Sequence, residues 1–421
     1  MFKKHWKLAV VMAIFGVLVL ALAGCAQKTQ TGDETSKLIN PDGTSKDTAP
    51  KEETGSIKVG AVFPLTGEGA AYGVPMQQVI QIALAKVNSN GGINGRNLEF
   101  VWEDGKCNGN DSAAAAQKLI SIDQVKIILG GFCSSETLGI APIAEQSKVV
   151  VLSSGSSSPD ITNAGDYIFR NYPSDSSQGK IIAQIAFEMG LKKAGLLTEQ
   201  NDYTFGISKV FKSTFEANGG TVIEQTFLPT DSDFKTQILK LKSEKVDMIF
   251  INPQTPTKGD LLLKQLQEQG LKAQLFANDV VMGWTESLTR YKDYVEGMIG
   301  AEASYQKDSA EFLELAAKYK EATGKPDLDY AAYSSTTYDA VMIIAEGLKQ
   351  VGNDAEAFKA FLYGIKNREG LAGTLTIDAN GDPLSGHKPE IVKNGKTEPY
   401  VSTIAQPSAT QPAQDVPGSS T

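Results

Sequence analysis

The chain has 421 residues, of which 41% are hydrophobic and 21% are charged, and its formal net charge is −9. Single hydrophobic cores stop growing near ~250–300 residues, so this length predicts more than one compact lobe. The acidic balance, without a run of Lys or Arg, argues against nucleic acid and anionic lipid surfaces as partners.

Residues 1–24 predict an export signal. Lys3, Lys4 and Lys7 precede an uninterrupted apolar run over residues 8–23, which is too short and wrongly flanked for a stable membrane span. The sequence LAGC ending at Cys25 resembles the lipobox of bacterial lipoproteins. This resemblance implies a lipid on the Cys25 sulfur and Cys25 as the first mature residue, with an ordinary signal peptide as the alternative. Removal of the signal takes three lysines, and the net charge falls from −9 to −12.

Residues 25–56 are rich in Thr, Lys, Asp, Glu, Ser and Pro, and they contain almost no large apolar side chain. Such a segment cannot bury a core, so we expect a lipid-anchored disordered tether. Residues 401–421 have a similar bias toward Pro, Ser, Ala and Gln, which predicts a disordered tail.

Two cysteines remain in the mature chain, Cys107 and Cys133. In an exported protein an even pair favours a disulfide, which would close a loop of about 26 residues and stabilise the fold by about 3 kcal/mol. Metal binding is the alternative, but it needs further ligands, and His387 is the only histidine of the mature chain. We therefore expect no metal and no other cofactor.

From Ile57 onward, apolar runs alternate with amphipathic stretches in two series, which predicts two α/β units with parallel strands. The first series has strands at 57–65, 97–104, 126–131 and 149–154 with helices between them. The second has strands at 194–198, 221–228, 246–252, 274–279 and 298–304. Helices at 309–322, 334–350 and 355–364 follow, and Asn-Gly pairs at 380–381 and 394–395 predict hairpin turns.

Two strand-to-helix turns follow one another in residues 129–162. Ser134 and Ser135 begin one predicted helix, and Ser157 and Ser158, with Pro159 in the first turn, begin the next. Free N–H groups and hydroxyls at the carboxyl ends of parallel strands form a carboxylate or phosphate site. Two capped helices without a ligand are the alternative.

Other motifs in the chain do not match a catalytic site, a nucleotide-binding site or a calcium-binding loop. The glycines of TGEGAAYG at 66–73 miss the G-x-G-x-x-G spacing, and DANGD at 378–382 lacks the Gly and Glu that a calcium loop requires. A serine nucleophile needs a base, but there is no G-x-S-x-G motif, and His387 is predicted in a hairpin turn. We therefore expect a binding protein and not an enzyme.

The predicted strand at 274–279 ends in Asp279, which could face the serine turns and pair with a ligand ammonium group. A solvated helix cap is the alternative for this side chain. Tyr72, Tyr203 and Tyr333 also lie at element boundaries and could wall a cleft.

Six segments resemble the periplasmic leucine/isoleucine/valine-binding family of ABC-transporter components: GAVFPLTGEGAAYG, NGGINGRNLEFVWEDGKC, GGFCSS, SSGSSSPDIT, FRNYPSDSSQG and NDYTFG. These segments occur in the order of the family, and the resemblance as a whole covers residues 57 to about 400. The resemblance implies a type I periplasmic-binding fold, with two doubly wound α/β lobes joined by three crossovers and a ligand cleft that closes by a hinge. Lobe one would be residues 57–174 and 304–376, and lobe two would be residues 175–303 and 377–400.

The resemblance also implies roles for individual residues. Cys107 and Cys133 match the family disulfide. In the serine turns, Ser134 and Ser157 would bind the ligand α-carboxylate and the Gly155 carbonyl would help to hold the ammonium group. Ser156 is a further predicted ligand-binding residue. Asp279 occupies the position at which the family has an acidic residue that pairs with the ligand ammonium group. Tyr72, Tyr203 and Tyr333 occupy positions at which the family has aromatic residues around the ligand side chain.

Two departures from the family pattern bear on specificity. Gln254 stands where branched-chain binders carry an aromatic residue, and Asp in place of Glu at position 279 shortens the acidic side chain. An amino acid or small amide with some polarity therefore fits as well as Leu, Ile or Val.

The sequence thus predicts a monomeric solute-binding protein of an ABC importer, lipid-anchored at the outer face of the cytoplasmic membrane or in the periplasm. It would deliver an amino-acid-like ligand to permease subunits. The alternative is a ligand-sensing module of the same fold that acts in signalling.

Overall fold

The computed structural model describes residues 55–401. The predicted signal peptide, Cys25, nearly all of the predicted tether and residues 402–421 lie outside this range, so those predictions are not addressed by the structure. Among the described residues, no helix combines the length and the apolar character that a membrane span requires.

The first sheet contains five parallel strands in the order β2-β1-β3-β4-β5. Its strands are β1 (Ile57–Phe63), β2 (Leu98–Asp104), β3 (Ile127–Gly130), β4 (Val150–Ser153) and β5 (Ile168–Arg170). In β1, Val59, Ala61 and Phe63 pack into one hydrophobic core, whereas Val62 packs into another on the opposite face. A strand that is buried on both sides explains the near-continuous apolar run in the sequence.

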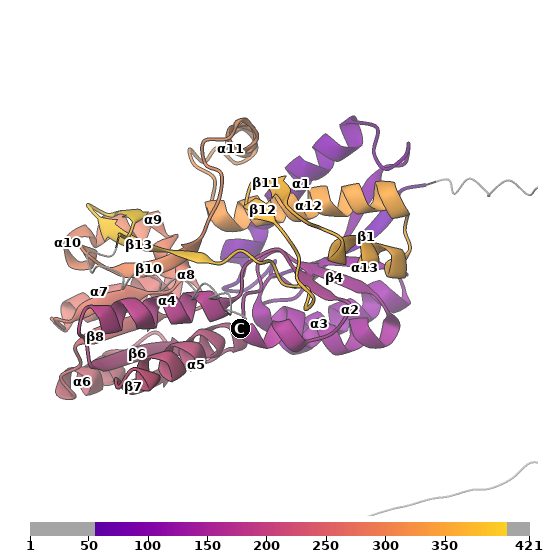
Figure 1. The fold of residues 1–421 in the computed structure, drawn as a ribbon. Helices are drawn as coiled ribbons and strands as arrows, with labels where there is room; N and C mark the ends of the chain where they lie inside the picture. The colour runs from indigo at the N-terminus through magenta and orange to yellow at the C-terminus, as the bar shows by residue number, and fades with distance from the viewer. Residues whose placement is uncertain (1–54, 402–421) are drawn as a thin grey trace, which may run out of the picture. The chain divides into compact units, whose positions relative to one another are not determined.

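Helices cover both faces of the first sheet (Figure 1). On one face, α1 (Ala70–Ser89) packs against α11 (Ala310–Thr323) and α12 (Ala331–Val351), and α12 contacts α13 (Ala355–Tyr363). On the other face, α2 (Gly109–Ser121) packs against α3 (Ser134–Ser147). We call this sheet with its helices the first lobe.

The second sheet has seven strands in the order β14-β13-β10-β9-β8-β6-β7. Five are mutually parallel, namely β6 (Lys193–Glu199), β7 (Thr221–Phe227), β8 (Met248–Asn252), β9 (Gln274–Ala277) and β10 (Ile299–Ala303). The antiparallel hairpin β13 (His387–Lys393) and β14 (Lys396–Pro399) extends this sheet beside β10. Its turn is the predicted Asn394-Gly395 pair, with φ angles of 52° and 75° that these residue types tolerate.

We call this sheet with its helices the second lobe. The helices are α4 (Asp175–Glu188), α5 (Asp202–Ala217), α6 (Lys235–Ser243), α7 (Pro256–Glu268), α8 (Asp279–Met282), α9 (Thr285–Arg290) and α10 (Lys292–Val295). The chain passes between the two lobes through residues 171–174, 304–309 and 376–386, which agrees with the predicted two-lobed α/β fold.

The helix predicted after Ser158 is present as a five-residue 3₁₀ helix, η1 (Pro159–Asn163), with Ser158 as its N-cap. Two other local predictions were wrong in detail. Around Asn380-Gly381 only an isolated bridge between Ile377 and Pro383 forms. His387, which was expected in a turn, begins β13 and pairs with Ala303 of β10.

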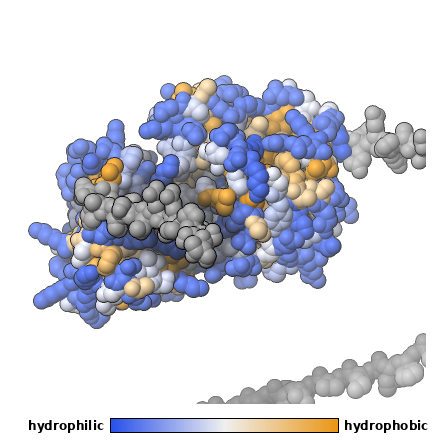
Figure 2. Space-filling model, in the orientation of Figure 1, coloured by the Kyte–Doolittle hydropathy of each residue, from blue (hydrophilic) through white to orange (hydrophobic). Residues whose placement is uncertain are grey.

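Hydrophilic residues cover most of the face shown in Figure 2, and apolar residues are scattered over it in small groups. Large hydrophobic side chains that are exposed come from separate elements, such as Val74 of α1 and Leu239 of α6.

Candidate ligand-binding site

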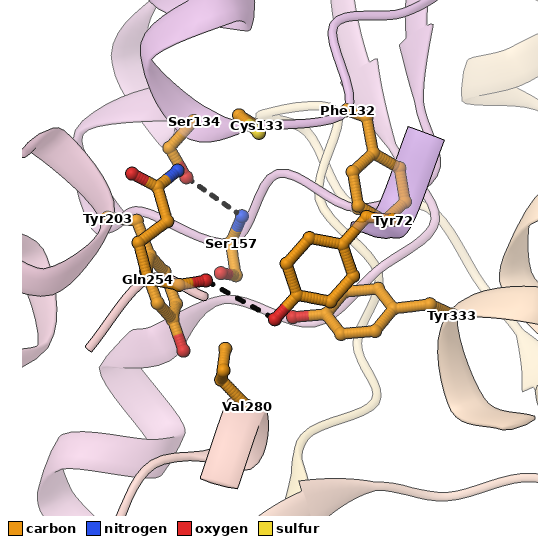
Figure 3. A pocket seen from close by; sticks show the side chains of 10 residues that line it. Tyr72, Phe132, Cys133, Ser134, Ser157, Tyr203, Gln254, Val280 and Tyr333 are labelled. Carbon is orange, nitrogen blue, oxygen red and sulfur yellow. Dashed lines mark hydrogen bonds between the residues drawn. The ribbon is translucent and has the colours of Figure 1, made fainter. Parts of the chain in front are cut away.

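A cavity lies between the lobes, at the carboxyl ends of strands from both sheets (Figure 3). In parallel α/β sheets this edge is where ligands bind. The first lobe contributes Tyr72, Phe132, Cys133, Ser134, Gly155, Ser157 and Tyr333, and the second contributes Tyr203, Gln254 and Val280. The cavity volume is about 30 Å³, which is room for about two water molecules.

Ser134 and Ser157 lie beside each other in one wall of this cavity (Figure 3). The Ser134 hydroxyl accepts hydrogen bonds from the backbone N–H groups of Ser157 (3.3 Å) and Ser158 (3.1 Å). The buried Ser157 hydroxyl has no hydrogen-bond partner among the described residues. A buried hydroxyl without a partner costs free energy, so it marks a place where a ligand atom would be stabilised.

The carboxyl group of Asp175 is buried near Ser157. Burial and then the charge of Asp279 raise the pKa of Asp175 well above its ordinary value, while the hydrogen-bonding hydroxyl of Ser157 lowers it. Asp175 Oδ2 has no partner within the geometric limits of a hydrogen bond in the described structure.

The loop before Ser134 is held by the buried carboxylate of Glu136. Its Oε2 accepts the N–H groups of Phe132 (2.8 Å) and Cys133 (3.0 Å), and its Oε1 accepts the N–H of Cys107 (2.9 Å). The Cα atoms of Cys107 and Cys133 lie 5.1 Å apart, a separation suited to a disulfide. Burial raises the pKa of Glu136 to about 8, against the lowering by these N–H groups.

The loop after β4 is anchored by buried polar contacts. Ser156 points its hydroxyl away from the cavity, to Thr137 Oγ1 (2.7 Å) and to the carbonyl of Gly131 (2.9 Å). Arg170 donates to the Ser158 carbonyl (2.8 Å) and pairs with Asp382 through two contacts of 2.7 Å. These contacts fix the backbone on both sides of Ser157.

Gly155 is required by the same close packing. A Cβ atom at this position would meet the ring of Phe132 at 2.6 Å. The rings of Phe132, Tyr72 and Tyr333 gather on one side of the cavity, with centroids 5.3–6.0 Å apart (Figure 3).

Asp279 lies behind the cavity wall and is 2% exposed. Its Oδ1 accepts from Tyr203 OH (2.5 Å) and Gln178 Nε2 (3.0 Å), and its Oδ2 accepts from Tyr333 OH (2.7 Å) and Tyr172 OH (2.8 Å). All four donors are neutral, and no Lys, Arg or His nitrogen within residues 55–401 pairs with this carboxylate. Asp279 therefore places an uncompensated negative charge beside the cavity.

The tyrosines around Asp279 remain protonated over the physiological pH range. Burial, with the Asp279 charge as the second cause, raises the pKa of Tyr172, Tyr203 and Tyr333 well above the ordinary value. Their hydroxyls therefore stay hydrogen-bond donors toward the carboxylate.

The cavity brings together Tyr72, Ser134, Gly155, Ser157, Tyr203, Gln254 and Tyr333 from the set that the sequence selected. Ser156 and Asp279 stand behind its wall. The sequence interpretation missed Phe132 and Val280, which are the immediate neighbours of residues it had selected, and Tyr172 and Gln178, which contact Asp279. Tyr172 follows β5, and its position at a strand end was an available signal.

Comparisons with known proteins agree with this geometry. Residues 56–387 match the family model described as periplasmic binding protein. The chain is 30% identical over 335 residues to the leucine-, isoleucine-, valine-, threonine-, and alanine-binding protein of Pseudomonas aeruginosa, which covers 78% of this chain and 87% of that protein.

Two solved structures are similar to the chain. The leucine binding protein LivK of Thermotoga maritima has a TM-score of 0.73 and 27% identity, covering 82% of this chain and 98% of that chain. A solute binding protein of an ABC transporter from Rhodopseudomonas palustris, in complex with 3,4-dihydroxy benzoic acid, has a TM-score of 0.71 and 24% identity, covering 84% and 99%. At this identity the second structure supports the fold alone.

Proposed function

Because the chain belongs to the periplasmic binding protein family, we propose that it is the solute-binding component of an ABC importer and captures an amino-acid-like ligand between its lobes. Its relatives are named as binders of leucine, isoleucine, valine, threonine and alanine, or of leucine. In this role the chain binds and releases its ligand without chemical change.

The observation that carries the proposal is the unpaired Ser157 hydroxyl in the wall of the interlobe cavity. It lies beside Ser134, at the N-terminus of the fourteen-residue helix α3. Hydroxyl and N–H donors at a helix N-terminus favour an anionic group, so this wall binds the ligand α-carboxylate.

Asp279 supplies the opposite charge. Its oxygens already accept four hydrogen bonds, and this number fills the lone-pair sites of a carboxylate. A ligand ammonium group could therefore interact with the Asp279 charge in two ways. It would lie on the far side of the tyrosine hydroxyls and be attracted through them, or it would replace one of these hydroxyls as a hydrogen-bond donor to Asp279. In both cases the buried negative charge favours a cationic group in the cavity.

Several finer features belong to the same proposal. A lipid on Cys25 anchors the protein outside the cytoplasm, and a disulfide joins Cys107 to Cys133 and stiffens the loop before Ser134. The protein is a monomer, the lobes have the bounds given above, and the ligand passes to permease subunits. A sensing role for the same fold is the alternative function.

A thermal-shift screen tests the ligand class, because ligand in excess raises the melting temperature by mass action. Amino acids, small amides and short carboxylic acids would be screened at equal concentration. A rise with one or more α-amino acids, and with none of the matched carboxylic acids, supports the proposal. A rise with carboxylic acids alone contradicts the role of Asp279.

Two further measurements test the remaining features. Mass spectrometry of the mature protein should find lipid on Cys25 and a bridge between Cys107 and Cys133. Loss of ligand uptake in cells that lack this protein would support transport, whereas unchanged uptake with altered gene expression would support sensing.

A further inference from the structure

A second cavity adjoins the first and is much larger, with a volume of about 520 Å³ against about 30 Å³. Gln254 lines both cavities. Ser134 and Cys133 line the first, whereas Ser135 and Cys107 line the second. Ser135 follows Ser134 in the chain and the Cα atoms of the two cysteines are 5.1 Å apart, so the two cavities are neighbours.

The small cavity has room for about two water molecules, so an amino acid held by Ser134 and Ser157 must extend beyond it or widen it. Gln254 borders both cavities, so a ligand that extends past Gln254 enters the second cavity. An aromatic side chain, which the resemblance predicts at this position for branched-chain binders, would form an apolar barrier there, whereas Gln254 offers polar atoms.

Glu199, the last residue of β6, lines the second cavity and is 1% exposed. Its Oε2 accepts the backbone N–H of Gln254 (2.7 Å), and in the described part of the chain this is the carboxylate's one hydrogen bond. Burial raises the pKa of Glu199 to about 7, while the Gln254 N–H and Lys258 lower it. A nearly buried carboxylate with an unused oxygen therefore borders an open cavity.

The lysines near Glu199 make their ion pairs with other carboxylates. Lys258, whose charge lowers the pKa of Glu199, pairs with Glu68 (3.3 Å) and donates to the Asp231 carbonyl (2.7 Å). Lys106, the lysine in the cavity wall, pairs with Asp111 (3.0 Å). The other ionisable groups of the wall are the carboxylates of Glu68 and Asp202, so the cavity as a whole is acidic.

We propose that the second cavity is the subsite for the ligand side chain, and that Glu199 there accepts hydrogen bonds from a terminal ammonium group. The inference rests on the proposed function, since the serine wall must first hold the α-carboxylate. It assigns the ligand to the diamino acids, such as lysine and ornithine, with Glu199 as the residue that selects them.

Isothermal titration calorimetry with L-lysine, L-ornithine and L-norleucine tests the assignment. Norleucine has the four-carbon chain of lysine without the terminal ammonium group. The wild-type protein should bind lysine or ornithine at least about tenfold more tightly than norleucine, because a hydrogen bond to a charged group is worth about that factor or more. This comparison needs no variant.

Glu199→Gln retains an oxygen for the Gln254 N–H but removes the charge. It should bring the affinities for lysine and norleucine to within about threefold of each other, while the norleucine affinity stays within about twofold of wild type. Glu199→Asp is the second variant, and it should restore part of the preference. Asp202→Asn removes a charge from an exposed residue of the same cavity wall and should change the preference less than twofold.

The outcomes separate the two proposals. Tighter binding of norleucine than of lysine by the wild type, or an unchanged preference in Glu199→Gln, overturns the inference and leaves the proposed function standing. Binding of no α-amino acid at all would overturn the proposed function and the inference together.

Discussion

Ser157→Ala separates ligand recognition from folding, because the Ser157 hydroxyl has no partner within the described chain. Removing it breaks no hydrogen bond of the free protein and takes away a buried hydroxyl without a partner, so the free energy of unfolding should be unchanged or higher. The melting temperature should then equal or exceed that of wild type.

Ligand binding should respond strongly to the same change. A hydrogen bond to a charged group contributes about 1.5–3 kcal/mol, and the ligand carboxylate would lose one, so the affinity should fall by about 10- to 150-fold. Calorimetry with an amino acid that the thermal-shift screen identifies, combined with thermal unfolding of the free protein, measures both quantities.

Ser156→Ala is the matched control, one residue away. Its hydroxyl bonds to Thr137 and to the Gly131 carbonyl and does not line the cavity. This variant should lose about 1–3 kcal/mol of stability. Unchanged affinity in Ser157→Ala, or a loss of stability equal to that of Ser156→Ala, would refute the carboxylate role of Ser157.

Three other predictions concern buried charges. Asp279→Asn should lower the affinity for α-amino acids by more than about 30-fold, because their ammonium group loses its counter-charge. The affinity for carboxylic acids of the same skeleton should stay nearly the same, and equal losses of affinity in calorimetry would contradict this prediction. Arg170→Met should lower the unfolding free energy in urea by about 3–5 kcal/mol, since it leaves the Asp382 carboxylate buried and unpaired, and Arg170→Met with Asp382→Leu should recover most of the loss. Burial lowers the pKa of His387 to about 4, whereas the pKa in the unfolded state is about 6.5. As the pH falls, the unfolded state therefore takes up a proton before the folded state does. The stability that this histidine provides is present above pH ~6.5 and is lost between pH ~6.5 and ~4. Relative to His387→Gln, the wild type should therefore lose about 2–3 kcal/mol between pH 7 and pH 4.5, and parallel curves for the two proteins would show that His387 does not titrate in this way.

The serine wall could be predicted from sequence because its causes are local. Near-continuous apolar runs identify buried parallel strands, and hydroxyl residues directly after them must lie at the carboxyl edge of the sheet. Ser134 and Ser157 follow neighbouring strands β3 and β4, so their proximity follows from strand order.

The environment of Asp279 could not be predicted, because its partners are distant in sequence. Gln178 and Tyr172 are 101 and 107 residues away, and Tyr333 is 54 residues away on α12. Each looks ordinary in its own segment, and only the packing of the lobes brings their donors to one carboxylate. Glu199 was missed for the same reason, since its partner is a backbone N–H that lies 55 residues later.

His387 shows how a local signal can mislead. Pro383 and Pro389 flank it, and proline usually indicates a turn or a sheet edge. In the structure β13 lies between β10 and β14, and Pro389 faces Ala301 in the antiparallel ladder. The tertiary pairing with β10 outweighs the local preference, and it buries His387 next to Ser177 and Asp175.

In the proposed function, ligand recognition is coupled to lobe closure, and contacts between the lobes at the cleft mouth contribute to the closed form. There the Tyr72 hydroxyl donates to the Gln254 carbonyl (3.2 Å), and Glu68 pairs with Lys258 (3.3 Å). A neutral hydrogen bond contributes about 1 kcal/mol, and an ion pair with a half-exposed partner contributes about 0–1 kcal/mol. The Tyr333 hydroxyl of the first lobe also donates to Asp279 of the second (2.7 Å), and a hydrogen bond to a charged group contributes about 1.5–3 kcal/mol. Together these contacts favour the closed form by roughly 100-fold or more. A ligand whose two ends engage Ser157 of the first lobe and the Asp279 charge of the second would add contacts that exist only when the lobes are closed, so a molecule that lacks either end should shift the closed population less than the complete ligand does.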